Sequence, residues 1–263
     1  MPEGDTVHWT AAKLHAGLSG QVLTRSDFRI PSLATSDVSG ATVVETLPRG
    51  KHLLTRLDTG ITLHTHLKME GSWTVHPVGT RWRKPAHTAR VVLRTASTEA
   101  VGFQVLLDLV RTSGEDRFVG HLGPDLLGPD WDADVALSNL RSDPDRPIGE
   151  ALLDQRHLAG IGNVYKSELC FLGHVDPLAA VRDVPDLPGI VDAAQRLLEA
   201  NRARPNRITT GDRRPGNRLW VYGRRGPCVR CGTPVRKADQ GPPGQQRPTY
   251  WCPRCQPALG DGP

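Results

Sequence analysis

The chain has 263 residues, which is enough for two domains or for one domain with a small appendage. Its composition, with 38% hydrophobic and 23% charged residues, is ordinary for a soluble globular protein, and no apolar run is long enough to span a bilayer. With a net charge of +5 and no secretory signal pattern in the opening MPEGDTVHWT, we expect a cytoplasmic protein.

The charge is unevenly distributed along the chain. Between Arg202 and Cys255 there are 13 Lys and Arg against 2 Asp and Glu, so the rest of the chain is acidic overall. A basic block of this size indicates a surface that binds a polyanion. The alternative is a solvated arginine-rich surface of the kind that GC-rich genomes encode, and charge alone leaves both interpretations open.

The first predicted element is a helix over residues 5–18, where apolar side chains recur at helical spacing. From about residue 21 to residue 110, short segments rich in Val, Leu and Thr are punctuated by Gly, Pro and Ser, which favours an antiparallel β-sandwich or barrel. These segments are ATVVETL, HLLTRL, GITLHTHL, ARVVLRT and VGFQVLLDL.

Residues 120–134 contain three Gly and two Pro and are predicted to be a linker. Beyond them the pattern becomes helical, and an Arg-, Gly- and Pro-rich loop at 203–219 precedes a small cysteine-bearing module with strand-like segments LWVYG and PTYWC. The predicted helices are 135–140, 148–157, 164–172 and 190–201. The fold class expected from this order is α+β.

Four of the five cysteines form two CxxC pairs near the end of the chain, Cys228 with Cys231 and Cys252 with Cys255. Two such turns facing each other make a tetrahedral cage of four sulfurs, which favours one structural Zn²⁺ with no open coordination position. The alternative is four free cysteines or a redox pair. The fifth cysteine, Cys170, lies in an apolar helical stretch and is predicted to be a buried thiol rather than a nucleophile.

Two other groups could carry chemistry. Removal of Met1 exposes Pro2 as a secondary amine, whose pKa lies well below that of lysine, and the helix that follows lowers it further. Such an amine can form an iminium ion with a sugar C1′, with Glu3 as general acid–base; the alternative is a disordered or capping terminus. His64 and His66 share one face of a strand and, without a nearby carboxylate or third ligand, are interpreted as packing or loop residues.

Several segments occur together in an order that resembles the formamidopyrimidine-DNA glycosylase/endonuclease VIII family. They are MPEGDTV, RGKHLL, HLKMEGSW, HLGPDLL, LDQRHLAGIGNVYKSE, VYGRRGPCVRCG and RPTYWCPRCQ, and they span nearly the whole chain. The resemblance implies an N-terminal β-sandwich flanked by helices, a helix–two-turn–helix domain and a zinc-bearing β-hairpin. The expected domains are a catalytic sandwich at 2–128, a helical DNA-binding domain at 129–219, a zinc hairpin at 220–256 and a disordered tail at 257–263.

The resemblance also implies roles for single residues. Pro2 corresponds to the nucleophile and Glu3 to the general acid–base, while Lys51 corresponds to a lysine that contacts the DNA backbone and assists catalysis. Asn163 corresponds to a phosphate-binding asparagine, and Arg247 to the hairpin arginine that grips phosphates beside the flipped nucleotide. From the residues alone, Lys51 could be a plain turn lysine and Asn163 a helix cap.

Met69 is the candidate for the side chain that fills the space left by a flipped base. The formamidopyrimidine branch adds an arginine and a phenylalanine from a second loop, whereas residues 106–110 here read LLDLV. The loop before the cysteine module, TTGDRRPGNRLWVYGR, resembles that of the actinobacterial endonuclease VIII branch, which implies oxidised pyrimidines as substrates.

The resulting hypothesis is a monomeric, bifunctional DNA glycosylase/AP lyase of base-excision repair that acts on damaged duplex DNA by β,δ-elimination, with no membrane association and, in a bacterium, at the nucleoid. One alternative is the same chemistry with a preference for formamidopyrimidine or 8-oxoguanine. Another is a catalytically inactive zinc-containing DNA-binding paralogue.

Overall fold

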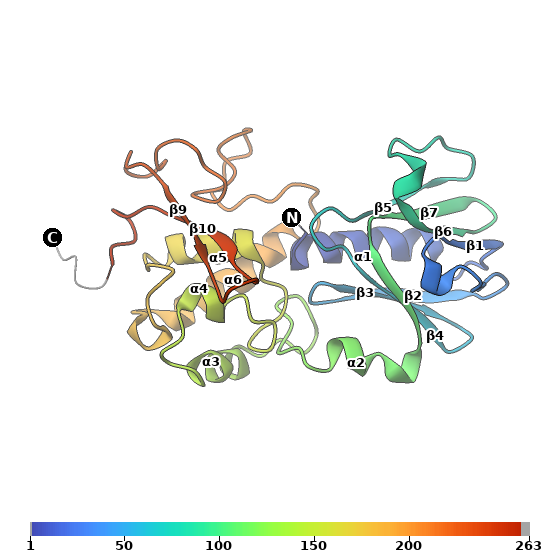
Figure 1. The fold of residues 1–263 in the computed structure, drawn as a ribbon, viewed down its shortest axis with the longest axis horizontal. Coiled ribbons are helices and arrows are strands. Elements are labelled where there is room, and N and C mark those ends of the chain that lie inside the picture. The colour runs from blue at the N-terminus through green and yellow to red at the C-terminus, as the bar shows by residue number, and fades with distance from the viewer. Residues whose placement is uncertain (1, 259–263) are drawn as a thin grey trace. The chain divides into compact units, whose positions relative to one another are not determined.

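A computed structural model of the chain describes residues 2–258 (Figure 1). The chain divides into two compact units, Met1–His121 and Leu122–Pro263, and each is described by itself. The tail expected to be disordered at 257–263 falls mostly outside the described residues. Among residues 2–258, no helix combines the length and the hydrophobicity that crossing a membrane requires.

The N-terminal unit begins with helix α1, Gly4–Leu18, which confirms the predicted helix. Its buried side chains follow the helical repeat, and they pack into the same core as side chains from both sheets of the unit. The helix begins at Glu3, whose backbone is extended and whose carbonyl accepts the first helical hydrogen bond, from the amide of Val7.

Two four-stranded antiparallel sheets form the sandwich, in the orders β1-β6-β7-β5 and β2-β3-β4-β8. The first contains β1 (Arg25–Phe28), β6 (Ala89–Arg94), β7 (Thr98–Phe103) and β5 (Ser72–Pro77). The second contains β2 (Val43–Arg49), β3 (His52–Leu57), β4 (Ile61–His66) and β8 (Leu106–Arg111). Both sheets contribute buried Val and Leu to one core, so the predicted sandwich is confirmed. A short helix, α2 (Asp116–Val119), ends the unit.

The C-terminal unit is helical up to residue 201. Its helices are α3 (Ala133–Arg141), α4 (Ile148–Ala151), α5 (Asn163–Leu172) and α6 (Leu187–Asn201), and their apolar faces meet in one core. Three of the predicted helices are confirmed, but the one predicted at 148–157 is wrong in length. It ends early because Asp154 accepts hydrogen bonds from the backbone and side chain of Arg156 and from the side chain of Arg146, which stabilises a turn instead.

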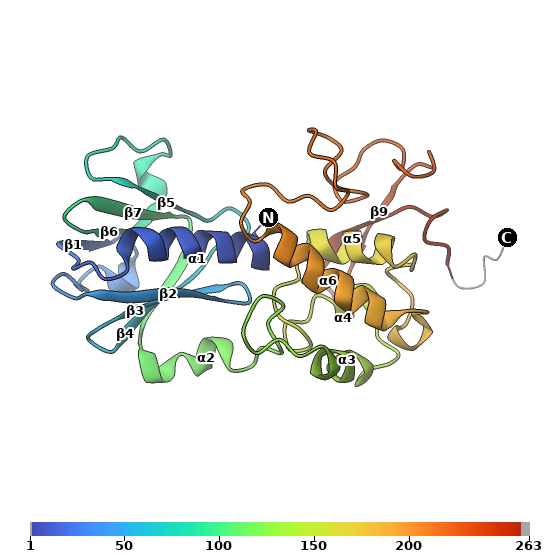
Figure 2. The same ribbon diagram turned by 180° about the vertical axis from the view of Figure 1, so that it is seen from behind.

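A two-stranded hairpin of β9 (Arg236–Gln240) and β10 (Arg247–Trp251) completes the unit (Figures 1 and 2). The predicted strand PTYWC corresponds to β10, whereas LWVYG is not a strand, so that prediction is wrong. The amides of Trp220, Val221 and Tyr222 donate to the carboxylate of Glu168 rather than to a neighbouring strand. The strand that pairs with β10 is RKADQ, which has too few apolar residues to be recognised from its pattern.

Candidate functional site

One end of the second sheet of the N-terminal unit brings several candidate residues together. The strand register places Arg49 opposite His52, His52 opposite His66, and His66 opposite Leu106. This row crosses all four strands at one end of the sheet, which we call the sheet edge. The turn that holds Lys51 and the loop that holds Met69 therefore lie beside each other.

Lys51 lies at the tip of the tight turn between β2 and β3. Gly50, which precedes it, has a φ of 56°, a left-handed conformation that glycine adopts without a steric penalty. The turn presents Lys51 beyond the end of the sheet, and the residue is half-buried there. The local sequence Arg-Gly-Lys is thus explained by the geometry of a two-residue hairpin turn.

Helix α1 carries Pro2 and Glu3 toward this same edge. The amide of Thr46 on β2 donates to Nδ1 of His15 at 3.3 Å, so α1 and β2 run antiparallel from that point. From His15 back to Glu3 the helix rises about 18 Å, and from Thr46 on to Lys51 the strand extends about 17 Å. The two paths match in length, and Figure 2 shows the start of α1 and the β2–β3 turn at the same end of the unit.

Glu3 is completely buried, although it is only two residues from Met1. Pro2 before it is partly exposed. A buried carboxyl group beside the chain end and at the positive end of α1 is suited to exchange protons with a group that reacts there.

Histidines form a cluster under this edge. Nδ1 of His52 lies 2.8 Å from Nε2 of His64, and Nδ1 of His64 lies 3.4 Å from the carboxylate of Asp108. The interpretation of His64 and His66 as packing residues missed both His52 and this carboxylate, which the strand register supplies. Burial, with the neighbouring histidine and lysine charges adding to it, lowers the pKa of His52 to about 3 and that of His66 to about 4.

Two exposed apolar side chains flank the same edge. Met69, in the loop after β4, is 58% exposed, and Leu106, the first residue of β8, is 53% exposed. A hydrogen bond of 3.2 Å from the Gln104 amide to the Glu70 carboxylate links the loop that contains Met69 to the loop that precedes Leu106. Lys68 and Gln104 both have positive φ, at 51° and 52°, so each loop contains one backbone position in the left-handed region. The sequence offered no reason to select Leu106.

In the C-terminal unit, Asn163 is the first residue of α5 and is almost completely buried. Its Nδ2 donates to the carbonyl of Pro248 on β10 at 2.5 Å, while its Oδ1 has no hydrogen-bond partner. Arg247, one residue before Pro248, is exposed. Asn163 therefore contacts the residue that directly follows Arg247, the other candidate phosphate-binding residue of this unit.

Glu168 organises the loop that precedes the cysteine module. Its buried carboxylate accepts from the amides of Trp220, Val221 and Tyr222 and from the hydroxyl of Thr209. A charged acceptor that satisfies several backbone donors replaces regular secondary structure in this stretch. Sequence reasoning missed Glu168, although it follows Asn163 on the same helix.

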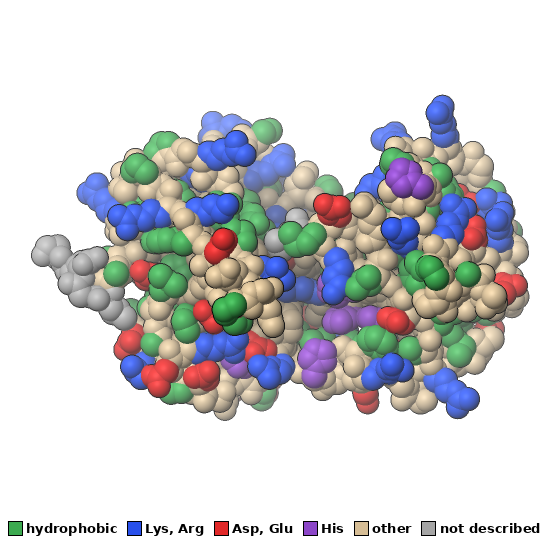
Figure 3. Space-filling view, viewed as in Figure 1, with side chains coloured by type: hydrophobic (Ala, Val, Ile, Leu, Met, Phe, Trp, Pro, Cys, Tyr) green, Lys and Arg blue, Asp and Glu red, His purple; other side chains and the backbone are tan. Residues whose placement is uncertain are grey.

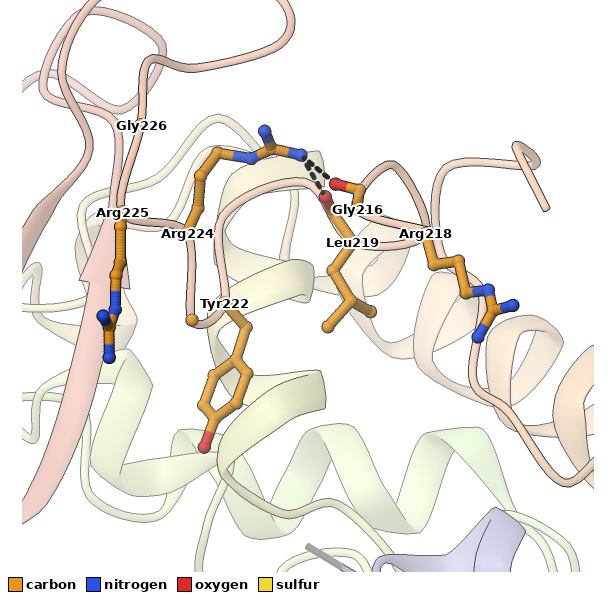
Figure 4. Close-up of a pocket in the computed structure, with 8 residues that line it drawn as sticks. Gly216, Arg218, Leu219, Tyr222, Arg224, Arg225 and Gly226 are labelled. Atoms are coloured by element: carbon orange, nitrogen blue, oxygen red, sulfur yellow. Dashed lines mark hydrogen bonds between the residues drawn. The ribbon is translucent and has the colours of Figure 1, made fainter. Parts of the chain in front are cut away.

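This loop surrounds a hollow of about 440 Å³ lined by Arg218, Tyr222, Arg224 and Arg225 (Figure 4). Arg224 folds back and donates to the carbonyls of Gly216 and Leu219, which fixes the loop. The guanidinium groups of Arg218 and Arg225 extend on opposite sides of the hollow. Lys and Arg side chains gather over the part of the unit formed by residues 202–255 (Figure 3), so the basic block of the sequence is a surface feature.

The four clustered cysteines have the geometry of a metal site. Their Sγ atoms all lie within 4.8 Å of one another, with Cys231 and Cys252 3.4 Å apart and Cys228 and Cys255 4.0 Å apart. Four thiolates at about 2.3 Å from a tetrahedral Zn²⁺ are about 3.8 Å apart, so the residues fit this ion. Cys170, in contrast, is buried in α5, and burial raises the pKa of its thiol to about 12.

Comparison with known proteins agrees with this arrangement. Residues 1–107 match the model of the formamidopyrimidine-DNA glycosylase N-terminal domain, and residues 122–201 match that of the formamidopyrimidine-DNA glycosylase H2TH domain. The chain is 60% identical to "Probable endonuclease 8 2" of Streptomyces coelicolor, over 97% of this chain and 94% of the relative. It is 50% identical to "DNA-(apurinic or apyrimidinic site) lyase Nei2" of Mycolicibacterium smegmatis, over 98% and 100% of the two chains.

The fold also matches solved structures of formamidopyrimidine-DNA glycosylase from Lactococcus lactis. One of these, non-covalently bound to DNA that contains an AP site, superposes with a TM-score of 0.79 at 23% identity, covering 97% of this chain and 99% of the other. Together with the two matching domain models, these relatives establish that the chain belongs to the formamidopyrimidine-DNA glycosylase/endonuclease VIII family.

Proposed function

We infer that the chain is a bifunctional DNA glycosylase/AP lyase of base-excision repair. The observation that carries this inference is the placement of Pro2 and the buried Glu3 at the sheet edge that also holds Lys51. The printed name of the Mycolicibacterium smegmatis relative, a DNA-(apurinic or apyrimidinic site) lyase, supports it. So does the basic surface of the C-terminal unit, because phosphates dominate DNA affinity.

The proposed nucleophile is the secondary amine of Pro2, exposed by removal of Met1. Its nitrogen bonds to C1′ of the damaged nucleotide, the base leaves with a proton, and Glu3 protonates the ring oxygen O4′ as the C1′–O4′ bond breaks. The resulting iminium ion acidifies C2′, so loss of a C2′ proton expels the 3′ phosphate. Loss of a C4′ proton then expels the 5′ phosphate, and water releases the sugar fragment from Pro2.

Three cationic or amide side chains are proposed to hold the DNA backbone. Lys51 projects from its turn beside the nucleophile, and Asn163 and Arg247 lie together on α5 and β10. A base must leave the helical stack before its C1′ can react, so the backbone has to be gripped on both sides of it. Within the C-terminal unit we propose 129–219 as the helical DNA-binding part and 220–256 as the metal-bearing part.

Met69 and Leu106 are proposed to fill the space that the extruded base leaves. Both are exposed, apolar and next to the same sheet edge, and the Glu70–Gln104 hydrogen bond holds the loop of Met69 to the loop that precedes Leu106. This pair replaces the arginine and phenylalanine of the formamidopyrimidine branch. The enzyme is therefore proposed to recognise the opposite strand by shape rather than by hydrogen bonds from arginine.

The ion in the cysteine site is proposed to be a single structural Zn²⁺. Four thiolates leave no coordination position for substrate, so the ion would hold the two CxxC turns together and would take no part in the reaction. Gln256 supports this role, because its side chain accepts from the amide of Cys252 and donates to the carbonyl of Val175.

Oxidised pyrimidines are the proposed substrates, because the relatives of highest identity described above carry endonuclease 8 or AP-lyase names. Cleavage rates on duplexes with thymine glycol or 8-oxoguanine test this preference. Faster cleavage of the thymine glycol duplex supports it, and faster cleavage of the 8-oxoguanine duplex favours the alternative specificity.

Borohydride reduction in the presence of an abasic duplex tests the chemistry itself. We expect a covalent protein–DNA adduct with protein whose mass shows that Met1 is absent. Pro2→Gly, which keeps an amine but lacks the pyrrolidine ring, should trap at least tenfold more slowly, and retained Met1 should abolish trapping while leaving DNA binding intact. No adduct from protein with a verified proline terminus would favour the inactive DNA-binding paralogue.

A further inference from the structure

One face of helix α5 binds three consecutive residues of the hairpin strand β10. Asn163 Nδ2 donates to the carbonyl of Pro248, Lys166 Nζ donates to Oγ1 of Thr249 at 2.6 Å, and the amide of Tyr250 donates to Oγ of Ser167. Positions 163, 166 and 167 have the i, i+3, i+4 spacing that places side chains on the same helical face. The helix thus fixes the strand residue by residue.

The contact between Lys166 and Thr249 continues as a chain of hydrogen bonds in which each side chain donates to the next group. Thr249 Oγ1 accepts from Lys166 and donates to Oε1 of Gln240 at 3.0 Å, and Nε2 of Gln240 donates to the carbonyl of Pro177 at 2.8 Å. Each side chain in the chain is buried, with exposed fractions of 0% for Lys166, 2% for Thr249 and 6% for Gln240. The two strands of the hairpin are therefore joined to each other and to the helical core.

Burying a lysine is costly, so its presence here calls for a specific partner set. The surroundings are shaped for this chain of contacts. A Cβ on Gly149 would lie 2.5 Å from Oε1 of Gln240 and 2.9 Å from the carbonyl of Pro177, so only glycine leaves room for the Gln240 amide.

The anchored point lies at the end of the hairpin that the metal site does not reach. Cys252 directly follows β10, whereas Gln240 is the last residue of β9 and pairs directly with Arg247 across the hairpin. A two-stranded hairpin is marginally stable by itself, so its far end needs its own support. The chain from Lys166 supplies that support at the residue pair that contains Arg247.

We propose that Lys166 is a positioning residue for DNA binding. Through Thr249 and Gln240 it holds the far end of the hairpin, so that Arg247 is already ordered when it contacts a backbone phosphate. The proposal rests on the DNA-binding role given to Arg247 above. Preorganisation of this kind raises affinity because the entropy of ordering the loop is not lost on binding.

The test is a double-mutant cycle on the full-length zinc protein, with dissociation constants for a duplex containing a tetrahydrofuran abasic analogue measured at several salt concentrations. Lys166→Met removes the ammonium group and keeps the side-chain length. We expect this variant to bind the duplex about tenfold more weakly. The slope of the logarithm of affinity against the logarithm of salt concentration should also become shallower by about one. Lys166 is itself buried, so this change in slope would report that Arg247 no longer contacts its phosphate. In an Arg247→Ala background, Lys166→Met should change the dissociation constant less than twofold.

Thr249→Val, which is isosteric and leaves every charge in place, should reproduce the loss, and it keeps the test decisive where Lys166→Met folds poorly. Lys13→Met, at an exposed lysine on α1, controls for the loss of one charge and should bind as the unaltered protein does. One zinc per chain in each variant shows that the cysteine site has formed.

The outcomes separate the two ideas. If Arg247→Ala leaves the dissociation constant and the salt slope unchanged, the role of Arg247 is wrong and the positioning role fails with it. If Arg247→Ala weakens binding but the losses from Lys166→Met and Arg247→Ala add fully, Lys166 acts on overall stability and the positioning role alone is overturned. Unchanged binding by both Lys166→Met and Thr249→Val overturns it as well.

Discussion

In the N-terminal unit, backbone geometry places the candidate groups. Helix α1 runs beside β2, and the strand register brings the turn that contains Lys51 and the loop that contains Met69 to the end of the sheet where Leu106 begins β8. In the C-terminal unit, buried polar side chains place them. Glu168 holds the loop before the cysteines, and Lys166 and Asn163 hold the hairpin.

The difference matters for what a substitution does in each unit. Where the backbone places a group, its side chain can be replaced with a loss of chemistry and little change elsewhere. Where a buried polar side chain places a loop, its replacement leaves several donors unsatisfied and disturbs every group on that loop. Five predictions can break or sharpen this contrast.

The largest expected effect is on catalysis by Glu3. Glu3→Gln should lower the rate of base removal by about 10²–10⁴-fold, because the amide cannot transfer a proton to O4′. Single-turnover assays on a thymine glycol duplex measure this rate. Binding of a tetrahydrofuran duplex should change little, and equal losses of rate and affinity would contradict the assignment.

Removal of the metal should have the second-largest effect, a loss of affinity for duplex DNA. Chelation should weaken duplex binding by about 10²-fold. Without the metal ion the two CxxC turns are no longer held together, so the hairpin that carries Arg247 is no longer fixed at its Cys252 end. Titration with a fluorescent duplex, before and after zinc is restored, measures the change. Cys170→Ala is the matched control: this buried cysteine lies outside the cluster, so the variant should retain one zinc per chain.

Glu168→Gln is the counterpart of Glu3→Gln in the other unit. The amide has a single acceptor oxygen, so its N–H groups face either the amides of Val221 and Tyr222 or the amide of Trp220 and the hydroxyl of Thr209. The free energy of unfolding should therefore fall by about 3 kcal/mol. Urea denaturation measures it. A variant as stable as the unaltered protein would show that the loop does not depend on this carboxylate.

These two glutamates also show what could be predicted from sequence. The two cysteine pairs lie in short local motifs whose chemistry can be recognised without a fold, whereas the roles expected of Pro2, Glu3 and Lys51 depended on the resemblance of their segments to a known family. Glu168, Lys166 and Leu106 could not be selected, because their partners are 52, 83 and 40 residues away along the chain at Trp220, Thr249 and His66. Long-range contacts decide their roles, and one sequence contains no record of such contacts.

Local pattern and long-range contacts also decide which elements of secondary structure could be predicted. Helices α1, α3, α5 and α6 were predictable because apolar residues recur in each of them at intervals of three or four residues. The strand β9, Arg-Lys-Ala-Asp-Gln, was not predictable because it has only one apolar residue. The irregular segment around Trp220 was not predictable because a side chain from a distant helix holds it.

The pair Met69 and Leu106 offers a smaller effect. Met69→Ala and Leu106→Ala should each slow base removal from duplex DNA by about tenfold, because less apolar surface fills the space of the extruded base. Strand cleavage at an abasic site in single-stranded DNA should be affected less. Val44→Ala is the control, since Val44 is 51% exposed on the same sheet but lies near the other end of β2.

The last effect is on the stability of the fold and concerns acid. The pKa of His52 is about 3 in the folded chain, below its ordinary value, because of burial and nearby histidine and lysine charges. The unfolded chain therefore takes up the proton first. Stability is complete above about pH 6.5 and should fall by about 2 kcal/mol toward pH 5. The denaturation midpoint of His52→Gln should depend less on pH in this range than that of the unaltered protein. The midpoint of His87→Gln, at an exposed histidine, should keep the pH dependence of the unaltered protein.

The antiparallel run of α1 and β2 has a consequence for how this protein can change. The nitrogen proposed to react is that of Pro2, so its position relative to the sheet is set by the number of residues between Pro2 and His15. One inserted or deleted residue in that stretch would shift the start of the helix by about 1.5 Å and rotate it by about 100°. The length of this segment therefore determines where Pro2 lies relative to the sheet. We expect related chains to differ in the composition of this segment far more often than in its number of residues.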